Sequence, residues 1–233
     1  MELERFTYPS YEEPLRSAYG GRFECVYAIL HPFVSLAASV AACVSGYPTD
    51  EQVRSHGRKY PWRQVAADAR LETYSEINRG LLSAILALKE EYRDDRACAA
   101  IGKVLETAGN IWMPPEGCFP ILLHEDILSA FEAKHSDEVV FLPEFPDLDP
   151  VQHLKLADLR STQKSLPYRG TLLPADGIFL FTVDWDSFFT LLYGPFAFVS
   201  DVVKQRQLEG FFLGESTRHA WWTEPVPIPA STS

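Results

Sequence analysis

Two aspartates flank a tryptophan between two apolar runs in the last third of the chain. The stretch Ile178 to Tyr193 reads IFLFTVDWDSFFTLLY, and its polar break is Asp184, Trp185, Asp186 and Ser187. Side chains alternate across a strand, so Asp184 and Asp186 share one side if the strand continues, with Trp185 opposite. Two such carboxylates can bind a divalent cation, or divide acid and base roles when their environments separate their pKa values. Asp and Ser also form turns through local backbone hydrogen bonds, which would make the same residues purely structural.

Two histidines are further candidates for acid–base or metal chemistry at this break. His31 precedes Pro32 at the end of an apolar run, and His219 lies two residues before Trp221. A histidine beside Asp184 would give a pair able to act as a general base or to ligate a metal ion. The alternative is a partly buried imidazole that is hydrogen-bonded to backbone. No HExxH, HxH or Cys/His spacing occurs in the sequence, so nothing local requires a metal site.

Other familiar chemical motifs are absent from the sequence. It contains no GxSxG, GxxxxGK[ST] or GxGxxG, so we predict neither a nucleophile elbow nor a phosphate loop, and no cofactor is evident. The run His124, Glu125 and Asp126 has metal-ligating types, but adjacent residues at a helix start point apart. The acids more simply complement the helix dipole there. No two cysteines have CxxC spacing, which predicts reduced thiols in a reducing compartment.

An acidic loop with an aromatic residue is the last candidate, for binding rather than catalysis. The segment Pro143 to Pro150, PEFPDLDP, contains Glu144, Phe145, Asp147 and Asp149. Carboxylates steer a basic partner towards a surface, and exposed aromatic residues anchor it. The alternative is a solvated loop without a partner. Three tryptophans are open to the same anchoring role, namely Trp185, Trp221 and Trp222.

The overall charge limits the classes of partner. The formal net charge is −11, which disfavours binding to nucleic acid or to an anionic membrane and suits a basic protein. Basic residues just before and at the start of the segment 62–82 suggest a helix-turn-helix. However, Glu72 and Glu76 fall where a recognition helix needs neutral or basic side chains. The apolar run Ala28 to Val44 is shorter than the ~20 residues of a membrane span, and the acidic start MELERF is unlike a signal peptide. We therefore expect a cytoplasmic protein.

Hydrophobic periodicity indicates the elements that must position these residues. Spacings of three and four residues predict helices over residues 74–93, 95–108, 127–134, 151–160 and 197–207. Alternating or β-branched runs predict strands over residues 23–30, 138–142, 178–183, 188–193 and 209–213. Thr49 followed by Gln52 predicts a capping box on a short helix that ends near Gly57.

The order of these elements predicts an α+β fold, with a largely antiparallel C-terminal sheet packed against N-terminal helices. We expect residues 1–233 to form a single domain with two lobes. Residues 1–135 would be mainly helical, residues 136–222 would form strands with interspersed helices, and residues 223–233 would be a frayed tail. The N-terminal arm would lie over the body through its aromatic residues Phe6, Tyr8 and Tyr11.

Three phrases together resemble a bacterial family known only as a domain of unknown function, number twenty-seven eleven. They are ILHPF at Ile29 to Phe33, VDWDSFFTLLYG at Val183 to Gly194, and LEGFF followed by TRHAWW. The resemblance covers most of the chain, from His31 to Trp222. It implies a bacterial, cytosolic origin and transfers no catalytic residue, since no chemistry is assigned to the family.

Two functional hypotheses follow from the sequence. The first is a non-enzymatic protein of immunity or regulatory type that binds a basic partner, because acidity and aromatic candidates are present without a nucleophile or cofactor motif. The second is a metal-dependent or acid–base hydrolase that uses Asp184, Asp186 and His219, with His31 in support. Convergence of these side chains in one cleft favours the enzyme, whereas carboxylates that face solvent count against it.

Overall fold

The chain forms two compact units, and both draw on distant parts of the sequence. The computed structural model describes residues 6–145, 149–161 and 166–229. Unit 1 comprises Met1–His31 and Pro115–His219, and unit 2 comprises Pro32–Pro114 and Ala220–Ser233. The sequence therefore divides after residues 31, 114 and 219, and no division falls near residue 135.

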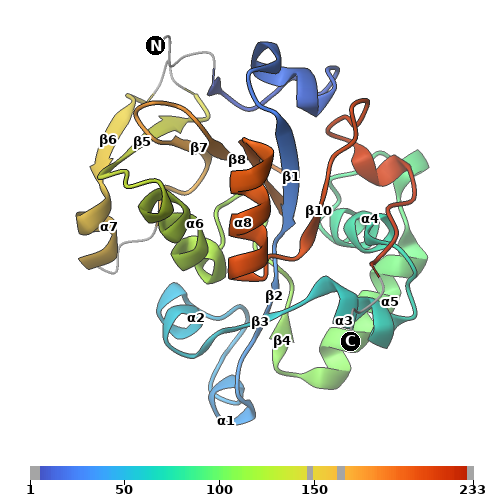
Figure 1. Ribbon diagram of the computed structural model, residues 1–233. Coiled ribbons are helices and arrows are strands. Elements are labelled where there is room, and N and C mark those ends of the chain that lie inside the picture. Colours follow the sequence, from blue (N-terminus) through green and yellow to red (C-terminus); the bar gives the residue numbers. More distant parts are fainter. Residues whose placement is uncertain (1–5, 146–148, 162–165, 230–233) are drawn as a thin grey trace. The chain divides into compact units, whose positions relative to one another are not determined.

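Unit 1 is built on a seven-stranded antiparallel sheet (Figure 1). The strand order is β10-β1-β9-β8-β7-β5-β6. The strands are β1 (Cys25–Leu30), β5 (Glu138–Pro143), β6 (Gln152–Lys155), β7 (Gly170–Leu173), β8 (Leu180–Val183), β9 (Phe189–Gly194) and β10 (Gly210–Phe212). The prediction of an α+β fold with a largely antiparallel sheet is confirmed. The first strand of the chain lies between β9 and β10, so the sheet joins the two ends of the sequence.

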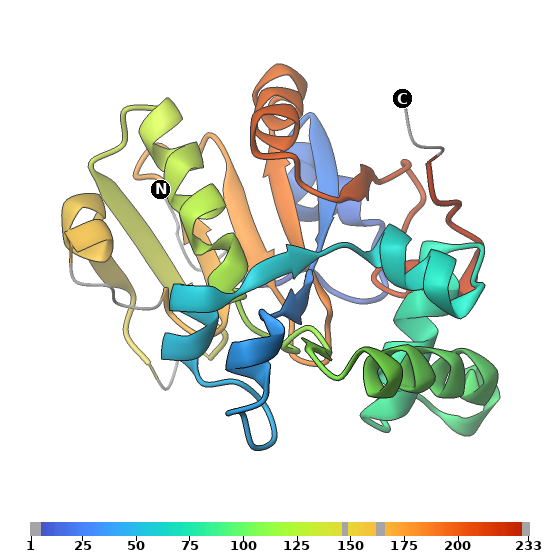
Figure 2. The ribbon, with the colours of Figure 1, turned by 90° about the horizontal axis from the view of Figure 1, so that it is seen from below.

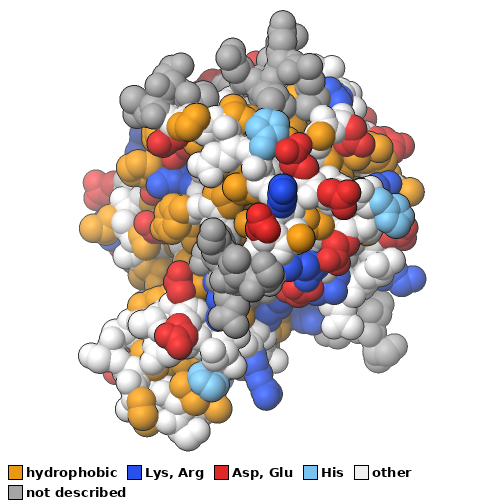
Figure 3. All heavy atoms as spheres, turned by 90° about the vertical axis from the view of Figure 1, so that its left-hand side faces the viewer, with side chains coloured by type: hydrophobic (Ala, Val, Ile, Leu, Met, Phe, Trp, Pro, Cys, Tyr) orange, Lys and Arg blue, Asp and Glu red, His pale blue; other side chains and the backbone are white. Residues whose placement is uncertain are grey.

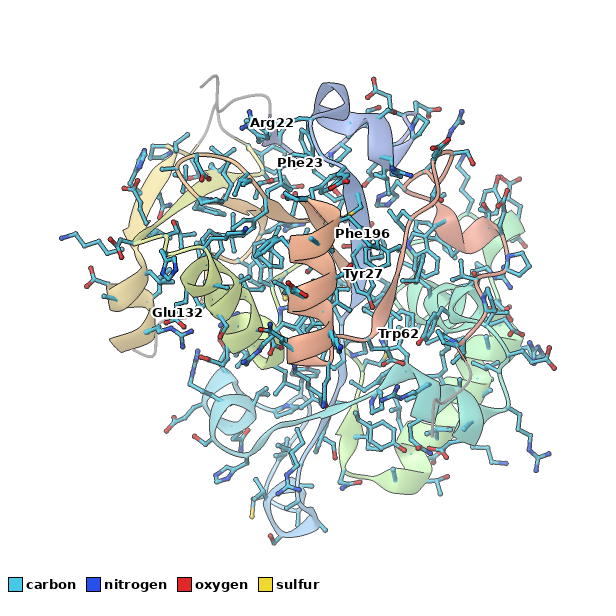
Figure 4. The ribbon with its side chains drawn as sticks, viewed as in Figure 1. Arg22, Phe23, Tyr27, Trp62, Glu132 and Phe196 are labelled. Atoms are coloured by element: carbon cyan, nitrogen blue, oxygen red, sulfur yellow. The ribbon has the colours of Figure 1, made fainter. Side chains whose placement is uncertain are left out.

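Three helices cover one face of this sheet. They are α6 (Ile121–Ala133), α7 (Leu156–Ser161) and α8 (Phe196–Arg206), and α6 and α8 lie on the same side in both ribbon views (Figures 1 and 2). Phe131 of α6 packs against Phe179 with ring centroids 4.9 Å apart. Glu132 of α6 points towards α7, where Arg160 binds its carboxylate (Figure 4). These covering helices begin at residue 121, whereas the predicted helices over residues 74–93 and 95–108 belong to unit 2.

The N-terminal arm contacts the opposite face of the sheet. Phe6 is buried, and the Tyr19 ring within the 3-10 segment Leu15–Gly21 meets Tyr193 of β9 at 5.1 Å. Tyr193 points away from the core under α6 and α8, because its neighbour Leu192 belongs to that core. The Leu15 N–H donates to the Thr217 carbonyl over 2.8 Å, which joins the arm to the end of unit 1.

Unit 2 combines short helices with a small three-stranded sheet of order β3-β2-β4. The strands are β2 (Phe33–Ser35), β3 (Arg58–Tyr60) and β4 (Ile111–Trp112). The helices are α1 (Ala38–Ala41), α2 (Asp50–His56), α3 (Trp62–Ala69), α4 (Tyr74–Ala84) and α5 (Asp95–Ala108), with 3-10 turns at Glu90–Tyr92 and Trp221–Thr223. The predicted capping box at Thr49 and Gln52 is confirmed, and Asp94 caps α5 through the Ala97 N–H.

Two helix predictions were wrong in extent or type. The helix expected over residues 74–93 ends at Ala84, because Leu86 adopts a left-handed φ of 60° and the Ala87 N–H returns to the Leu82 carbonyl. The helix expected over residues 151–160 is divided between β6 and α7, since its first half pairs with β5. Strand β7 was not predicted at all.

Helix α6 begins earlier than predicted, at Ile121, so His124 and its acidic neighbours lie inside the helix rather than at its start. Asp126 consequently does not serve the helix dipole but binds Arg206 of α8, with Nε and Oδ1 2.9 Å apart. The described part of the tail is also ordered by contacts. The Tyr74 N–H donates to the Val226 carbonyl over 2.9 Å, and the Ser75 hydroxyl donates to the Glu224 carbonyl.

Two helical glycines provide a matched test of the packing of α4 on α5. A Cβ on Gly80 would lie 2.8 Å from Ile101 Cδ1, whereas a Cβ on Gly102 would meet nothing within 4 Å. We expect Gly80→Ala to lower the free energy of unfolding by about 1–3 kcal/mol through overpacking. Gly102→Ala should raise it by roughly 0.5–1 kcal/mol through helix propensity. Chemical denaturation measures both, and equal effects of the two substitutions would contradict this packing.

Candidate functional site

The turn between β8 and β9 carries Asp184, Trp185 and Asp186, and two hydrogen bonds hold its shape. The sequence predicted two buried strands joined by a tight turn over residues 184–187, and both strands are present. The Ser187 hydroxyl donates to the Asp184 carbonyl over 2.9 Å, and the Gly117 N–H donates to the Ser187 carbonyl over 2.8 Å. Gly117 has a φ of 55°, and a Cβ there would lie 2.7 Å from the Trp185 carbonyl oxygen. Only a glycine fits this approach, so the turn presents Trp185 and its flanking carboxylates in a fixed position.

Asp184 is a buried carboxylate that the N-terminal arm satisfies. Its side chain is largely removed from solvent, and the Tyr11 hydroxyl donates to its Oδ2 atom. His219 Nε2 lies 3.7 Å from the same oxygen, close enough for electrostatic interaction but beyond an ordinary hydrogen bond. Burial raises the pKa of Asp184 above its ordinary value, and the Tyr11 hydrogen bond opposes that rise.

His219 is a buried neutral imidazole between two tyrosines. The Tyr8 hydroxyl lies 2.8 Å from Nδ1, and the Tyr11 ring stacks on the imidazole with centroids 4.0 Å apart. Burial lowers the pKa of His219 to about 4, so the ring is neutral at pH 7. If Tyr8 donates to Nδ1, the single ring proton is on Nε2 and faces Asp184. Burial, followed by the nearby Asp184 charge, holds the pKa of Tyr8 well above its ordinary value, so its hydroxyl remains protonated.

His31 occupies a different position and bonds elsewhere. Its imidazole is fully buried, with Nε2 2.9 Å from the Thr190 hydroxyl and Nδ1 3.1 Å from the Pro115 carbonyl. Burial lowers its pKa to about 3. Both ring nitrogens are therefore engaged in holding the end of β1 to β9 and to the loop at Pro115.

Trp185 is an exposed residue flanked by acidic side chains that influence one another electrostatically. We call Glu116, Glu144, Asp184 and Asp186 the carboxylate cluster. Burial raises the pKa of all four members, and the Asp186 charge adds to the rise at Glu116 while the Asp184 charge adds to it at Glu144 and Asp186. The Trp185 side chain is 52% exposed, and the Arg169 guanidinium lies 5.0 Å from its ring centroid. Arg169 Nε also lies 3.0 Å from Glu144 Oε2.

The remaining candidates from the sequence lie in separate places. Trp221 and Trp222 are buried in unit 2, where the Arg79 guanidinium donates to the Trp222 carbonyl. Phe145 and Asp149 are exposed, and Asp147 lies outside the described residues. Among the residues that the structure describes, no group of three or more His, Cys, Asp or Glu side chains is arranged to hold a metal ion. Within the same ranges, no helix has the length and apolar character needed to cross a membrane.

Four contributors to the site were missed by sequence reasoning about chemistry. Tyr8 and Tyr11 were expected to dock the arm, but not to bond His219 and Asp184. Arg169 and Glu116 were not predicted to belong to the site, because a single charged residue in a polar loop carries no periodic signal. Tyr11 and Asp184 are 173 residues apart in sequence, so only the three-dimensional fold brings them together.

The neutral state of His219 predicts an acid-sensitive site. Because its folded pKa of about 4 is below the ordinary 6.5, its contribution to stability is present above pH 6.5 and is lost as pH falls towards 4. The loss should reach at most about 1.4 kcal/mol per pH unit. Imidazole NMR should show a titration midpoint near 4, and His219→Gln should reduce the acid sensitivity of unfolding. A midpoint near 6.5 would show that the ring is exposed to solvent.

Comparisons with known proteins agree with the family resemblance of the three sequence phrases. The chain is similar to the uncharacterized protein YwbB of Bacillus subtilis strain 168, with 20% identity over 176 residues that cover 76% of this chain and 77% of that protein. No solved structure matches the chain. The model of the family described as protein of unknown function (DUF2711) matches residues 11–223, from Tyr11 of the arm to the end of the paired tryptophans. The chain therefore belongs to this family of proteins of unknown function.

Proposed function

We propose that the carboxylate cluster and Trp185 bind a cationic side chain of a basic partner protein. The observation that carries this proposal is an exposed tryptophan that contacts Arg169 and belongs to the same turn as two of four acidic residues whose pKa values are all raised. The proposal makes the protein a non-enzymatic binding protein of regulatory or immunity type. It also places the protein in the cytoplasm, where its scattered cysteines would stay reduced.

The raised pKa values supply a driving force for binding a cation. A raised pKa means that the ionised carboxylate is less stable in the folded protein than in water, by 1.36 kcal/mol for each unit. Burial is the main cause of each rise, and the charges of Asp184 and Asp186 add to it at their acidic neighbours. A bound ammonium or guanidinium group would relieve their mutual repulsion, and the affinity would increase accordingly.

Arg169 is an example, within the chain itself, of a guanidinium group bound at this site. Its guanidinium lies over the Trp185 ring and binds Glu144, and it also lies 5.8 Å from the exposed Tyr168 ring. A planar guanidinium can stack on an indole and bond a carboxylate at the same time, which an ammonium does less well. One guanidinium cannot neutralise four carboxylates, so the cluster retains negative charge for a second cation. We therefore expect a partner arginine to be favoured over a partner lysine.

The overall charge of the protein and the charge of the cluster have different roles in this proposal. On the face shown in Figure 3, acidic and basic side chains are interleaved. The net charge of −11 would steer a basic partner towards the whole molecule, but charge alone would not select an orientation. The fixed turn with Trp185 at its tip would supply that orientation.

A second candidate function is acid–base hydrolysis at Asp184 and His219, with Asp186 nearby. It is favoured by the 3.7 Å approach of His219 Nε2 to Asp184 Oδ2. A general base must also reach a substrate proton. Here the His219 ring is stacked under Tyr11 and bonded to Tyr8, and the Ser187 hydroxyl is bonded to backbone carbonyls. These engagements favour the binding proposal over the hydrolytic one.

Titration with a hexa-arginine peptide and a hexa-lysine peptide tests the binding proposal. Calorimetry at low salt should show tighter binding of the arginine peptide, weakening as salt is added. Trp185→Ala should weaken binding by about threefold to thirtyfold, the range expected for loss of a cation–π contact. A double Glu116→Gln, Asp186→Asn variant should weaken it at least as much.

Two control variants separate the site from general electrostatics. Phe196 is an equally exposed aromatic residue of unit 1, and Glu215 is an exposed acid outside the cluster. Phe196→Ala and Glu215→Gln should leave the affinity unchanged. Equal weakening by Glu215→Gln, or no binding to the unaltered protein at low salt, would sink the proposal. Cleavage of the bound peptide that is abolished by His219→Gln would instead support the hydrolytic candidate.

A further inference from the structure

Unit 2 contains a groove that no part of the proposed function uses. Its volume is about 550 Å³, within the ~300–1,000 Å³ typical of sites for small ligands. It lies among the end of β3, the C-terminal end of α3 and one side of α5. The lining residues are Tyr60, Asp68, Ala69, Arg70, Ala100, Lys103, Val104, Thr107, Ala108 and Ile111.

The floor of the groove is apolar and made of small side chains. Ala100, Val104 and Ala108 follow one another at four-residue spacing on α5 and share one side of that helix. Ala69 faces them from α3, and the buried Ile111 closes one end. Three alanines and a valine leave space that larger apolar residues would fill, so a compact apolar group fits there without displacing the helices.

The rim of the groove carries one acidic and two basic side chains, and the acidic one is already hydrogen-bonded. Asp68, the acid that lines the groove, is already engaged: Tyr60 donates to its Oδ2 over 2.6 Å and Gln64 donates to its Oδ1 over 3.1 Å. Within the described residues, neither Arg70 nor Lys103 forms an ion pair or a side-chain hydrogen bond. Arg70 and Lys103 thus place two positive charges beside one apolar floor.

The backbone at Arg70 places its side chain at the C-terminal end of helix α3. Arg70 has φ 56° and ψ 46°, and the Leu71 N–H returns to the Ala66 carbonyl over 2.9 Å to close helix α3. Glycine or asparagine is favoured at this left-handed position, because a Cβ there clashes with backbone. Leu86 and Gln207 of this chain adopt the same conformation, so it closes the helix without itself indicating a ligand.

We propose that this groove binds a small organic carboxylate, with the apolar body on the α5 floor and the anion at Arg70 and Lys103. A guanidinium donates two parallel hydrogen bonds to a carboxylate, and a nearby ammonium adds attraction without a fixed geometry. The site is separate from the carboxylate cluster, which belongs to unit 1 and has the opposite charge. The chain would then hold one site for a cation and another for an anion.

The test is a ligand-observed NMR screen of the full chain against aryl and branched alkyl monocarboxylates, each paired with its own primary amide. Inorganic phosphate serves as the probe for an anion without an apolar body. We expect saturable binding of some carboxylates, with affinity at least about tenfold above that of the matched amide, corresponding to one charge-assisted contact. Phosphate should bind more weakly than these carboxylates.

Variants then assign the binding to the groove. Arg70→Gly should abolish the preference for carboxylate over amide while leaving the melting temperature equal or higher, since glycine relieves the left-handed backbone. Lys103→Gln should weaken carboxylate binding, and Lys89→Gln, an exposed lysine of unit 2 outside the groove, should not. Equal binding of acids and amides, full retention of the preference in Arg70→Gly, phosphate binding as tight as any carboxylate, or no saturable carboxylate in the panel would each overturn the proposal.

Discussion

Unit 1 depends on satisfying one buried carboxylate, that of Asp184 at the end of β8. A buried charge is costly unless polar groups surround it, and the neighbouring Trp185 backbone supplies one hydrogen bond here. The other groups come from distant parts of unit 1: Tyr11 of the N-terminal arm donates a hydrogen bond, and His219, the last residue of the unit, lies 3.7 Å away. The backbone bond from Leu15 to Thr217 holds these two segments together. The arm is thus part of the candidate site as well as a cover for the sheet.

The electrostatics of the buried pair differ from those of the exposed part of the cluster. Burial shifts the pKa of His219 down and that of Asp184 up, so burial favours the neutral form of each. At pH 7 the histidine is neutral and supplies no positive charge to Asp184. Arg169 supplies positive charge at Trp185 and Glu144, outside the buried pair. A carboxylate cluster with too little positive charge of its own is suited to receive a cation from another molecule.

The sequence predicts those parts of the fold whose signals are local. Alternation and turn residues predict β8 and β9, and the three- and four-residue spacing of apolar side chains predicts α5 over residues 95–108, because both signals depend on neighbours in sequence. The early end of α4 could not be predicted, since Leu86 rather than glycine takes the left-handed position. Pairing with β5 turned an apparently helical pattern at residues 152–155 into a strand. Asp184 and His219 could be nominated by residue type, but Tyr8 and Tyr11 join them only through contacts across the whole of unit 1.

The most direct test of this account is the carboxyl titration of Asp184, followed by carbon NMR in the unaltered protein and in Tyr11→Phe. Burial should place the midpoint above the ordinary value of 3.8, and loss of the Tyr11 hydrogen bond should raise it further, since that bond stabilises the ionised form. A midpoint at the ordinary value that Tyr11→Phe does not change would show that the arm does not cover Asp184. The site described here would then not exist in solution.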